Sequence, residues 1–273
     1  MKLKKKILLK VFYHFSMVGM IFFYFILLSF SSADIKNTEF EIIRTEKIPD
    51  KERFFTEKDA EILIKQKIQK GKPGLKYNNI YRTVQEINKS PYIVKSELFA
   101  VSKGILQLKV YQRVPLFRVQ NFRNEHFYID TSGHFFPCKK DFASEVPFVS
   151  GYVYESWHRF KELTMNEIEQ NEKLAHVFVL DDVWKIVNAI EKDSVLRLNI
   201  RNYYVNEQQE IVLIPSVGKH KIIFGGSERM TYKLKKLWLF YRDIAPYMNL
   251  NAYSSINLKF KNQIVCRKKN THP

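Results

Sequence analysis

The sequence predicts an α+β protein behind one transmembrane helix, and three observations lead to this prediction. An uncharged apolar run lies near the amino terminus. A strand, two helical stretches and two further strands follow in under ninety residues. Strand-like alternation with occasional helices then continues to the end of the chain. We therefore expect a small β-α-α-β-β domain, and after it a β-rich domain with flanking helices.

The first element is the run Val11–Phe30, which contains no Asp, Glu, Lys or Arg. It is long enough for a membrane-spanning helix, which needs about 20 apolar residues. Residues 1–10 hold five lysines, and such a basic flank favours a cytoplasmic amino terminus. We expect a cytoplasmic basic tail at residues 1–10, a transmembrane helix at residues 11–31 and an exported remainder. A cleaved signal peptide is the alternative, because Ser31 and Ala33 have the small-x-small spacing of a cleavage site.

The first domain has clear local signals. Thr56 and Asp59 have the spacing of a capping box, which predicts the start of a helix. A second helical stretch follows. Tyr92–Val101 and Ile105–Val114 then alternate with a period of two, which is typical of strands. We expect Leu108 of the last strand to face the helices.

The remaining elements are predicted from alternation, helical spacing and turn residues. The predicted elements are a helical stretch at Asn166–Lys192 broken at Asp181-Asp182, strands at Val195–Ile200, Ile211–Ile214 and Lys221–Phe224, a helix at Met230–Ala245, and a final hairpin of Ser255–Phe260 and Ile264–Lys268.

The composition excludes a disordered chain, because hydrophobic residues make up 45% and aromatic residues 15% of the sequence. The formal net charge is +17. In an exported protein this charge favours anionic lipid headgroups or an acidic partner, and we predict no nucleic-acid binding. A solvated lysine-rich surface is the alternative.

Cys138 and Cys266 could form one disulfide in an oxidising compartment or remain free thiols. The histidines lack the spacing of a zinc site, so we predict no metal and no cofactor. Asp130, Ser132 and His134 lack the surrounding motif of a hydrolase. Asp130 followed by Gly133 is instead typical of a tight turn. We predict no catalytic residue and no enzyme activity.

Short motifs in a fixed order extend along the chain. These are Ser90-Pro91-Tyr92, Val101, Gly104, Leu106–Arg113 and Pro115, then Phe127–Asp130, Gly133 and Phe135–Pro137, then Pro147, Gly151, Ile222–Gly225, Leu234–Asp243 and Ile256–Phe260. Behind a basic tail and an apolar run, this series resembles the FtsQ family of bacterial division proteins, called DivIB in Gram-positive cells. Gln112 departs from the family pattern, where Glu is common. The resemblance implies a POTRA-like domain at residues 37–119 and an FtsQ-type β domain at residues 120–273.

The resemblance also implies a function. It is that of a non-enzymatic scaffold of the division complex, in the cytoplasmic (inner) membrane at the septum, which links septal peptidoglycan synthesis to constriction. Partners of the FtsB/FtsL type would dock at the terminal strand, and other division proteins at the POTRA-like domain. The predicted partner-binding residues are Ile256, Asn257, Leu258, Lys259, Phe260, Ile264 and Val265. The alternatives are a POTRA-bearing factor for envelope assembly or secretion, and a cell-wall enzyme that uses Asp130 or His134.

Overall fold

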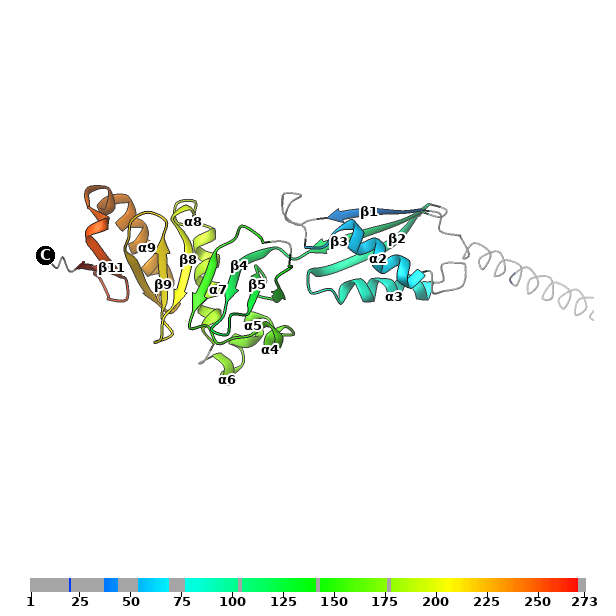
Figure 1. The fold of residues 1–273 in the computed structure, drawn as a ribbon, viewed down its shortest axis with the longest axis horizontal. Coiled ribbons are helices and arrows are strands. Elements are labelled where there is room, and N and C mark those ends of the chain that lie inside the picture. The colour runs from blue at the N-terminus through cyan, green and yellow to red at the C-terminus, as the bar shows by residue number, and fades with distance from the viewer. Residues whose placement is uncertain are drawn as a thin grey trace, which may run out of the picture. The chain divides into compact units, whose positions relative to one another are not determined.

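The structure is a computed structural model, which describes residue 20 and residues 37–43, 54–68, 77–102, 105–140, 143–175 and 178–269 (Figure 1). The predicted cytoplasmic tail lies outside the described residues, as does the predicted transmembrane helix except for Met20. Within the described ranges, every helix is too short or too polar to cross a membrane. The chain divides into two compact units, residues 1–112 and 113–273.

The first unit has the predicted order of strand, two helices and two strands. Its elements are β1 (Asn37–Ile43), α2 (Glu57–Ile68), α3 (Tyr77–Asn88), β2 (Ile93–Ser102) and β3 (Ile105–Gln112). The strands form a sheet in the order β1-β3-β2, with β1 parallel and β2 antiparallel to the central β3. Two helices inserted between the first two strands allow β1 to pair in parallel with β3, since a parallel pair needs a long connection.

Local hydrogen bonds and a small hydrophobic core stabilise the first unit. The predicted capping box is confirmed, because Thr56 N donates to Asp59 Oδ2 at 2.9 Å and Asp59 N donates to Thr56 Oγ1 at 3.3 Å. Leu108 is buried as predicted. Its core neighbours are Phe55, Ala60, Ile87, Ile93 and Val110.

The second unit is built on a mixed sheet of nine strands in the order β12-β11-β10-β9-β8-β7-β4-β5-β6, called the large sheet below. Its strands are β4 (Pro115–Gln120), β5 (His126–Asp130), β6 (Phe135–Pro137), β7 (Phe148–Gly151), β8 (Ile200–Val205), β9 (Ile211–Pro215), β10 (Lys221–Gly225), β11 (Tyr253–Asn257) and β12 (Val265–Lys268). Strand β7 is parallel to both of its neighbours, β4 and β8, and β10 is parallel to β11. The large sheet together with its helices confirms the α+β class.

Helices and turns follow the strands along the chain. They are α4 (Trp157–Phe160), α5 (Met165–Glu169), α6 (Glu172–Ala175), α7 (Val179–Glu191), α8 (Leu196–Asn199), α9 (Met230–Leu239), the π-helical turn η2 (Phe240–Ile244) and the 3₁₀ turns η3 (Ala245–Tyr247) and η4 (Leu250–Ala252). Ile186 of α7, Leu237 of α9 and Leu213 of β9 are fully buried in one core. The large sheet therefore buries one face under these helices.

Two predictions about this unit are wrong. The helical stretch does not break at Asp181 and Asp182, which lie in the first turn of α7, where acidic side chains favour a helix start. The predicted strand at 195–200 is largely the helix α8, and Leu198 is 72% exposed. The side chain of Asp193 accepts hydrogen bonds from the amides of Val195 and Leu196. These bonds favour the start of a helix over the strand that the alternating hydrophobic residues predicted.

Strand β4 pairs with β5 and β7 in the large sheet. Residues 115–119, which the prediction counted with the first domain, therefore lie in the second unit. The boundary between the two units lies between the adjacent residues Gln112 and Arg113. Gln112 accepts the amide of Phe55 in the first unit at 3.0 Å, and Arg113 donates to Asp130 in the second unit at 2.7 Å.

Candidate partner-binding edge

Strand β12 forms one edge of the large sheet, and β6 forms the other. It pairs antiparallel with β11 and, among the described strands, with nothing on its other side. Val265, Arg267 and Lys268 are exposed, whereas Cys266 packs partly against the core. A strand in this position presents backbone N–H and C=O groups to which another strand can be added.

Hydrogen bonds show which backbone groups of β12 face outward. Tyr253 of β11 lies opposite Lys268 of β12, and Lys269 N donates to Ala252 O at 2.9 Å, which is the pattern of a pair without its own backbone hydrogen bonds. The hydroxyl of Ser254 lies near the carbonyl oxygens of both Arg267 at 3.1 Å and Lys268 at 3.4 Å. Residues 267 and 269 therefore direct their backbone groups toward β11. Adjacent residues of a strand direct these groups to opposite sides, so the N–H groups of Cys266 and Lys268 face away from the sheet.

The connection between β11 and β12 is longer than predicted, and the strand predicted up to Phe260 is wrong beyond Asn257. The side chain of Asn257 accepts the amide of Lys259 at 3.0 Å, which turns the chain out of the strand. Residues 258–264, called the terminal loop below, then lead to β12. Asn262 in this loop has the left-handed φ of 61° that Asn tolerates better than most residues.

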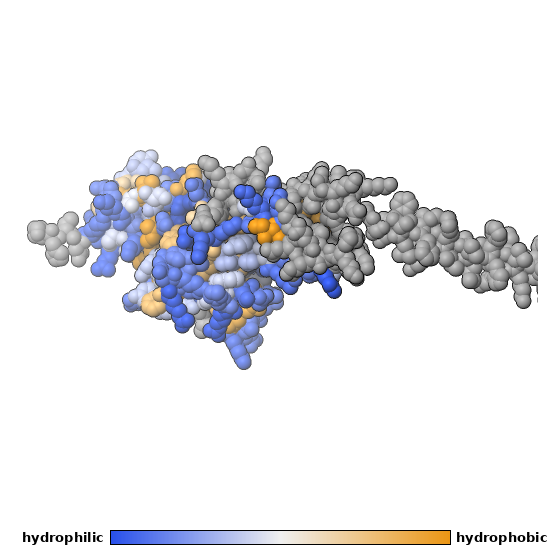
Figure 2. All heavy atoms as spheres, turned by 45° about the vertical axis from the view of Figure 1, so that its right-hand side comes forward, coloured by the Kyte–Doolittle hydropathy of each residue, from blue (hydrophilic) through white to orange (hydrophobic). Residues whose placement is uncertain are grey.

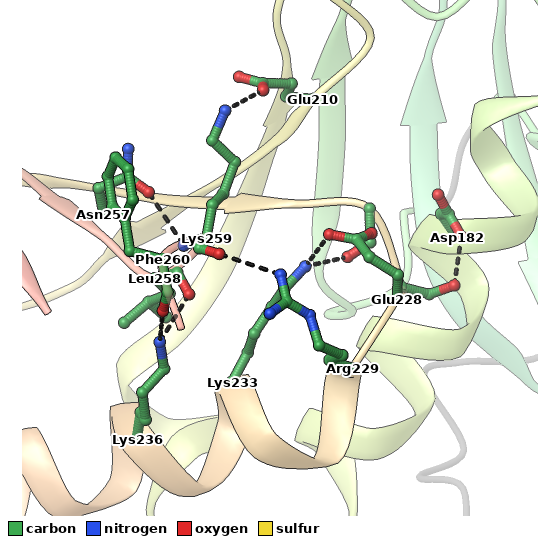
Figure 3. A network of polar contacts seen from close by, with 12 residues as sticks. Asp182, Glu210, Glu228, Arg229, Lys233, Lys236, Asn257, Leu258, Lys259 and Phe260 are labelled. Atoms are coloured by element: carbon green, nitrogen blue, oxygen red, sulfur yellow. Dashed lines mark hydrogen bonds and ion pairs between the residues drawn. The ribbon is translucent and has the colours of Figure 1, made fainter. Parts of the chain in front are cut away.

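Lys236 of α9 holds the terminal loop in place (Figure 3). Its ammonium group donates to the carbonyl oxygens of Leu258 at 2.8 Å, Phe260 at 2.7 Å and Gln263 at 3.2 Å. The side chain is buried, and burial lowers the pKa of Lys236, as do the nearby positive charges. The ammonium group is thus stabilised by backbone carbonyl dipoles instead of a carboxylate. Through these hydrogen bonds Lys236 connects the terminal loop to α9.

A second layer of contacts surrounds the loop (Figure 3). Arg229 donates to the carbonyl of Lys259 at 3.1 Å, and the Lys259 ammonium forms an ion pair with Glu210. The hydrogen bond from Lys259 is the main reason that the pKa of Glu210 is lowered. The hydroxyl of Tyr232 donates to the Asn262 side chain at 3.0 Å. The terminal loop is therefore a fixed surface.

The predicted partner-binding residues do not share one surface. Ile256 and Leu258 are fully buried in the core. Strand β11 lies between β10 and β12. Its residue Asn257 pairs with Ile223 of β10 on one side and with Val265 of β12 on the other. The backbone of β11 is thus not the free edge that the prediction required. Strand β11 pairs in parallel with β10, so the free edge of the sheet is on β12. No short stretch of the sequence indicates this parallel pairing.

The other predicted residues lie on the terminal loop and β12. Phe260 is 46% and Val265 is 40% exposed, so these two present apolar surface to solvent. Lys259 is held in its ion pair, and Ile264 packs against the core. Neither the outward N–H of Lys268 nor the role of Lys236 was predicted from the sequence. A signal for Lys236 existed, since it lies four residues before the buried Phe240 and so on the apolar side of α9.

A groove of about 390 Å³ opens between α8, the β9–β10 turn and the segment from α9 to η4. It is lined by Val195, Asn199, Val217, Trp238, Tyr241, Arg242, Ala245, Pro246 and Leu250. The π-helical turn places Arg242 over the Trp238 ring at 4.3 Å. Trp238 thus lines the groove. On the face drawn in Figure 2, the described surface is mostly hydrophilic, with separate hydrophobic patches.

Asp130 is confirmed as a turn residue. Its carboxylate accepts the amides of Ser132 and His134 at 2.9 Å, and Gly133 has a φ of +81°. Burial opposes the charge of Asp130, but hydrogen bonds from His134 and the Arg113 guanidinium outweigh it, so its pKa is lowered. The carboxylate is thus committed to holding the chain.

The described residues contain no group of three or more His, Cys, Asp or Glu that could hold a metal ion. Cys138 and Cys266 are free thiols. Cys138 follows β6 and Cys266 lies in β12, so the two lie at opposite edges of the large sheet.

A comparison with protein families adds an independent finding. A family model described as FtsQ/DivIB, C-terminal related, matches residues 114–267. This segment exceeds half of the chain and extends from the residue before β4 into β12. No curated protein matches the sequence.

Proposed function

We propose a function from the premise that the chain belongs to the FtsQ/DivIB C-terminal related family. This family is one of division scaffolds, which supports a role in cell division. We propose that the chain is a non-enzymatic scaffold that links septal peptidoglycan synthesis to constriction. Division partners of the FtsB/FtsL type dock at its C-terminal edge.

The free edge of β12 is the observation that carries this proposal. Strand addition takes its affinity from backbone hydrogen bonds and its specificity from side chains beside them. Cys266 and Lys268 direct their backbone N–H groups outward. Phe260 and Val265 supply exposed apolar contacts close to this edge. The bond from Lys236 fixes the terminal loop beforehand, which reduces the entropy that docking would cost.

The positive charge of residues 192–269 supports the proposal that the partner segment is acidic. Residues 192–269 hold fifteen Lys and Arg but only five Asp and Glu. Arg267, Lys268 and Lys261 lie on β12 and the terminal loop and are exposed. Opposite charges on two partners raise the rate of association and select against wrong partners.

We also propose the location and the role of the first unit. The apolar run at residues 11–31 anchors the chain in the cytoplasmic membrane, with both units outside the cytoplasm and the protein at the division septum. The first unit acts as a POTRA-like domain that binds other division proteins. Its order of strand, two helices and two strands supports this assignment.

Two proline substitutions on neighbouring residues test the docking edge. Lys268→Pro removes an outward N–H, so the chain should fold and lose about tenfold or more in affinity for an FtsB–FtsL complex. Arg267→Pro removes an N–H on the β11 side, so it should instead destabilise the sheet. Lys268→Ala keeps the backbone donor and should reduce affinity only modestly. Affinity is measured by calorimetry and folding by circular dichroism.

The pair of variants separates docking from folding. A Lys268→Pro chain that folds normally and binds the FtsB–FtsL complex with unchanged affinity would refute docking at this edge. Equal losses of affinity in folded Lys268→Pro and Lys268→Ala chains would also contradict it, because they would assign the affinity to the side chain.

A further inference from the structure

Two hairpins of the large sheet end in loops of the same structure. The loop Asn121–Glu125 joins β4 to β5, and the loop Asn206–Glu210 joins β8 to β9. In each loop the side chain of the first Asn accepts the amide of the Glu four residues later at 2.8 Å. The fourth residue of each loop, Asn124 or Gln209, has a left-handed φ of 63° or 59°. The sequences NFRNE and NEQQE are therefore one loop motif used twice.

These loops lie on either side of the segment that leaves β7. Because β7 is parallel to both β4 and β8, all three strands end on the same side of the large sheet (Figure 1). Phe122 N donates to Val153 O at 2.7 Å, and the Gln209 side chain donates to Tyr152 O at 2.8 Å. The Asn121 side chain donates to the carbonyl of Glu155 at 2.9 Å. Residues 121–125, 152–155 and 206–210 thus form one braced surface, called the loop platform below.

The loop platform carries a cluster of aromatic rings at its surface. Phe122 is 59% exposed and Tyr154 is 61% exposed. The Phe122 ring lies 5.5 Å from the rings of both Tyr152 and Tyr154, measured between centroids. The hydroxyl of Tyr152 donates to Glu207 at 2.8 Å, which holds its ring. Braced and exposed aromatic side chains offer large contact area at low entropic cost, which is typical of a binding surface.

The polar residues around the rings indicate what kind of ligand fits. The exposed polar side chains of the two loops are Arg123, Asn124, Glu207 and Gln208. All four end in flat groups that can form paired hydrogen bonds, and the one positive charge is balanced by one negative charge. This balance differs from the strongly basic composition of residues 192–269. The platform therefore suits a ligand without net charge that combines apolar faces with many hydroxyl and amide groups.

We propose that the loop platform binds the sugar rings of a polysaccharide. A pyranose ring has an apolar face that stacks on an aromatic ring and a rim of hydroxyl groups that bonds to flat polar side chains. Phe122 and Tyr154 supply the stacking surfaces, and Arg123 and Glu207 bond to the rim. The site lies at the carboxyl ends of β4, β7 and β8, on one side of the large sheet. Its aromatic rings lie on other residues than the β12 edge, although Glu210 of the platform forms an ion pair with Lys259 of the terminal loop.

The test uses the full chain purified in detergent, with tetra-N-acetylchitotetraose as the probe and calorimetry as the measurement. Phe122→Ala and Tyr154→Ala should each weaken binding of this saccharide about tenfold. Both side chains are more than half exposed, so both variants should keep the melting temperature of the parent chain. Phe260→Ala removes an exposed ring at the terminal loop and is the matched control, which should bind the saccharide normally.

Three outcomes would overturn this inference. They are absence of saccharide binding by the parent chain, equal saccharide binding by the parent and both platform variants, and binding of decaproline in place of the saccharide. The last outcome would assign the platform to a proline-rich protein. Binding of an FtsB–FtsL complex by Phe122→Ala and Tyr154→Ala is measured in parallel and should be unchanged. Failure of the saccharide site is thereby distinguished from failure of the docking edge.

Discussion

The two edges of the large sheet are built in opposite ways. Strand β6 has three residues, ends in Pro137, and buries both Phe135 and Phe136. Strand β12 exposes most of its side chains and contains no proline. Short strands, proline and burial are the usual means of protecting a sheet edge from another chain. The protein therefore closes one edge with its own residues and leaves the other available.

The closed edge gains its protection from the core. Phe135 lies 6.2 Å from the rings of both Phe160 and Phe178, measured between centroids. His134, just before β6, forms a bridge with Thr164. The open edge is instead supported by polar contacts to the terminal loop, chiefly from Lys236 and Arg229 to its backbone carbonyls. We therefore expect changes near β6 to act on stability and changes near β12 to act on binding.

The largest expected effect is at the closed edge. Asp130→Ala removes the carboxylate that pairs with Arg113 and holds the turn between β5 and β6. Asp130 is only 2% exposed, so the change leaves a poorly solvated guanidinium and unpaired amides. We expect the free energy of unfolding to fall by about 3–5 kcal/mol, measured by urea denaturation. A loss below about 1 kcal/mol would show that this edge is not held by Asp130.

The same carboxylate should make stability depend on pH. The pKa of Asp130 is lowered in the folded protein, so its contribution is present above the ordinary aspartate pKa of about 4. The contribution is lost as the pH falls through the folded value. The parent chain should therefore lose more stability than Asp130→Ala in this acidic range, as measured by melting temperature. Parallel curves for the two proteins would contradict the assignment.

An intermediate effect is expected at the open edge. Lys236→Met keeps a long side chain but removes the donor to the terminal-loop carbonyls. We expect a loss of about 1–3 kcal/mol in stability and weaker binding of an FtsB–FtsL complex, because the loop is released. Lys235→Met on the same helix is the matched control, since Lys235 is exposed. Equal results for the two variants would show that the lysine does not position the loop.

The smallest effect is expected from the thiols. Cys138 and Cys266 lie at opposite edges of a sheet of nine strands, which are about 4.8 Å apart. A disulfide needs Cα atoms within about 7 Å, so the two cannot pair within one chain. Replacing both by Ser should change stability by about 1 kcal/mol or less. Mass spectrometry after alkylation without reductant should find both thiols free, and a bond between them would contradict the order of strands.

Residues close in sequence could be predicted well. The capping box of Thr56 and Asp59 and the turn from Asp130 to Gly133 are confirmed, because each depends on hydrogen bonds within a few residues. The helix α8 was a local signal that was missed, since the cap by Asp193 could have been read from the sequence. The repeated loop motif of NFRNE and NEQQE could also have been recognised in the sequence. It explains why the loops of the two hairpins have the same structure.

The α+β class, the order of elements in the first unit and the resemblance to the FtsQ/DivIB family could all be predicted from the amino-acid sequence. These follow from hydrophobic period and turn chemistry, which are local properties. Three features became visible in the folded chain alone: β12 rather than β11 is the edge, Lys236 holds the terminal loop, and loops 121–125 and 206–210 meet around one segment. Each of these depends on strands pairing across long separations, and that pairing is set by how the whole core packs rather than by any short stretch of residues.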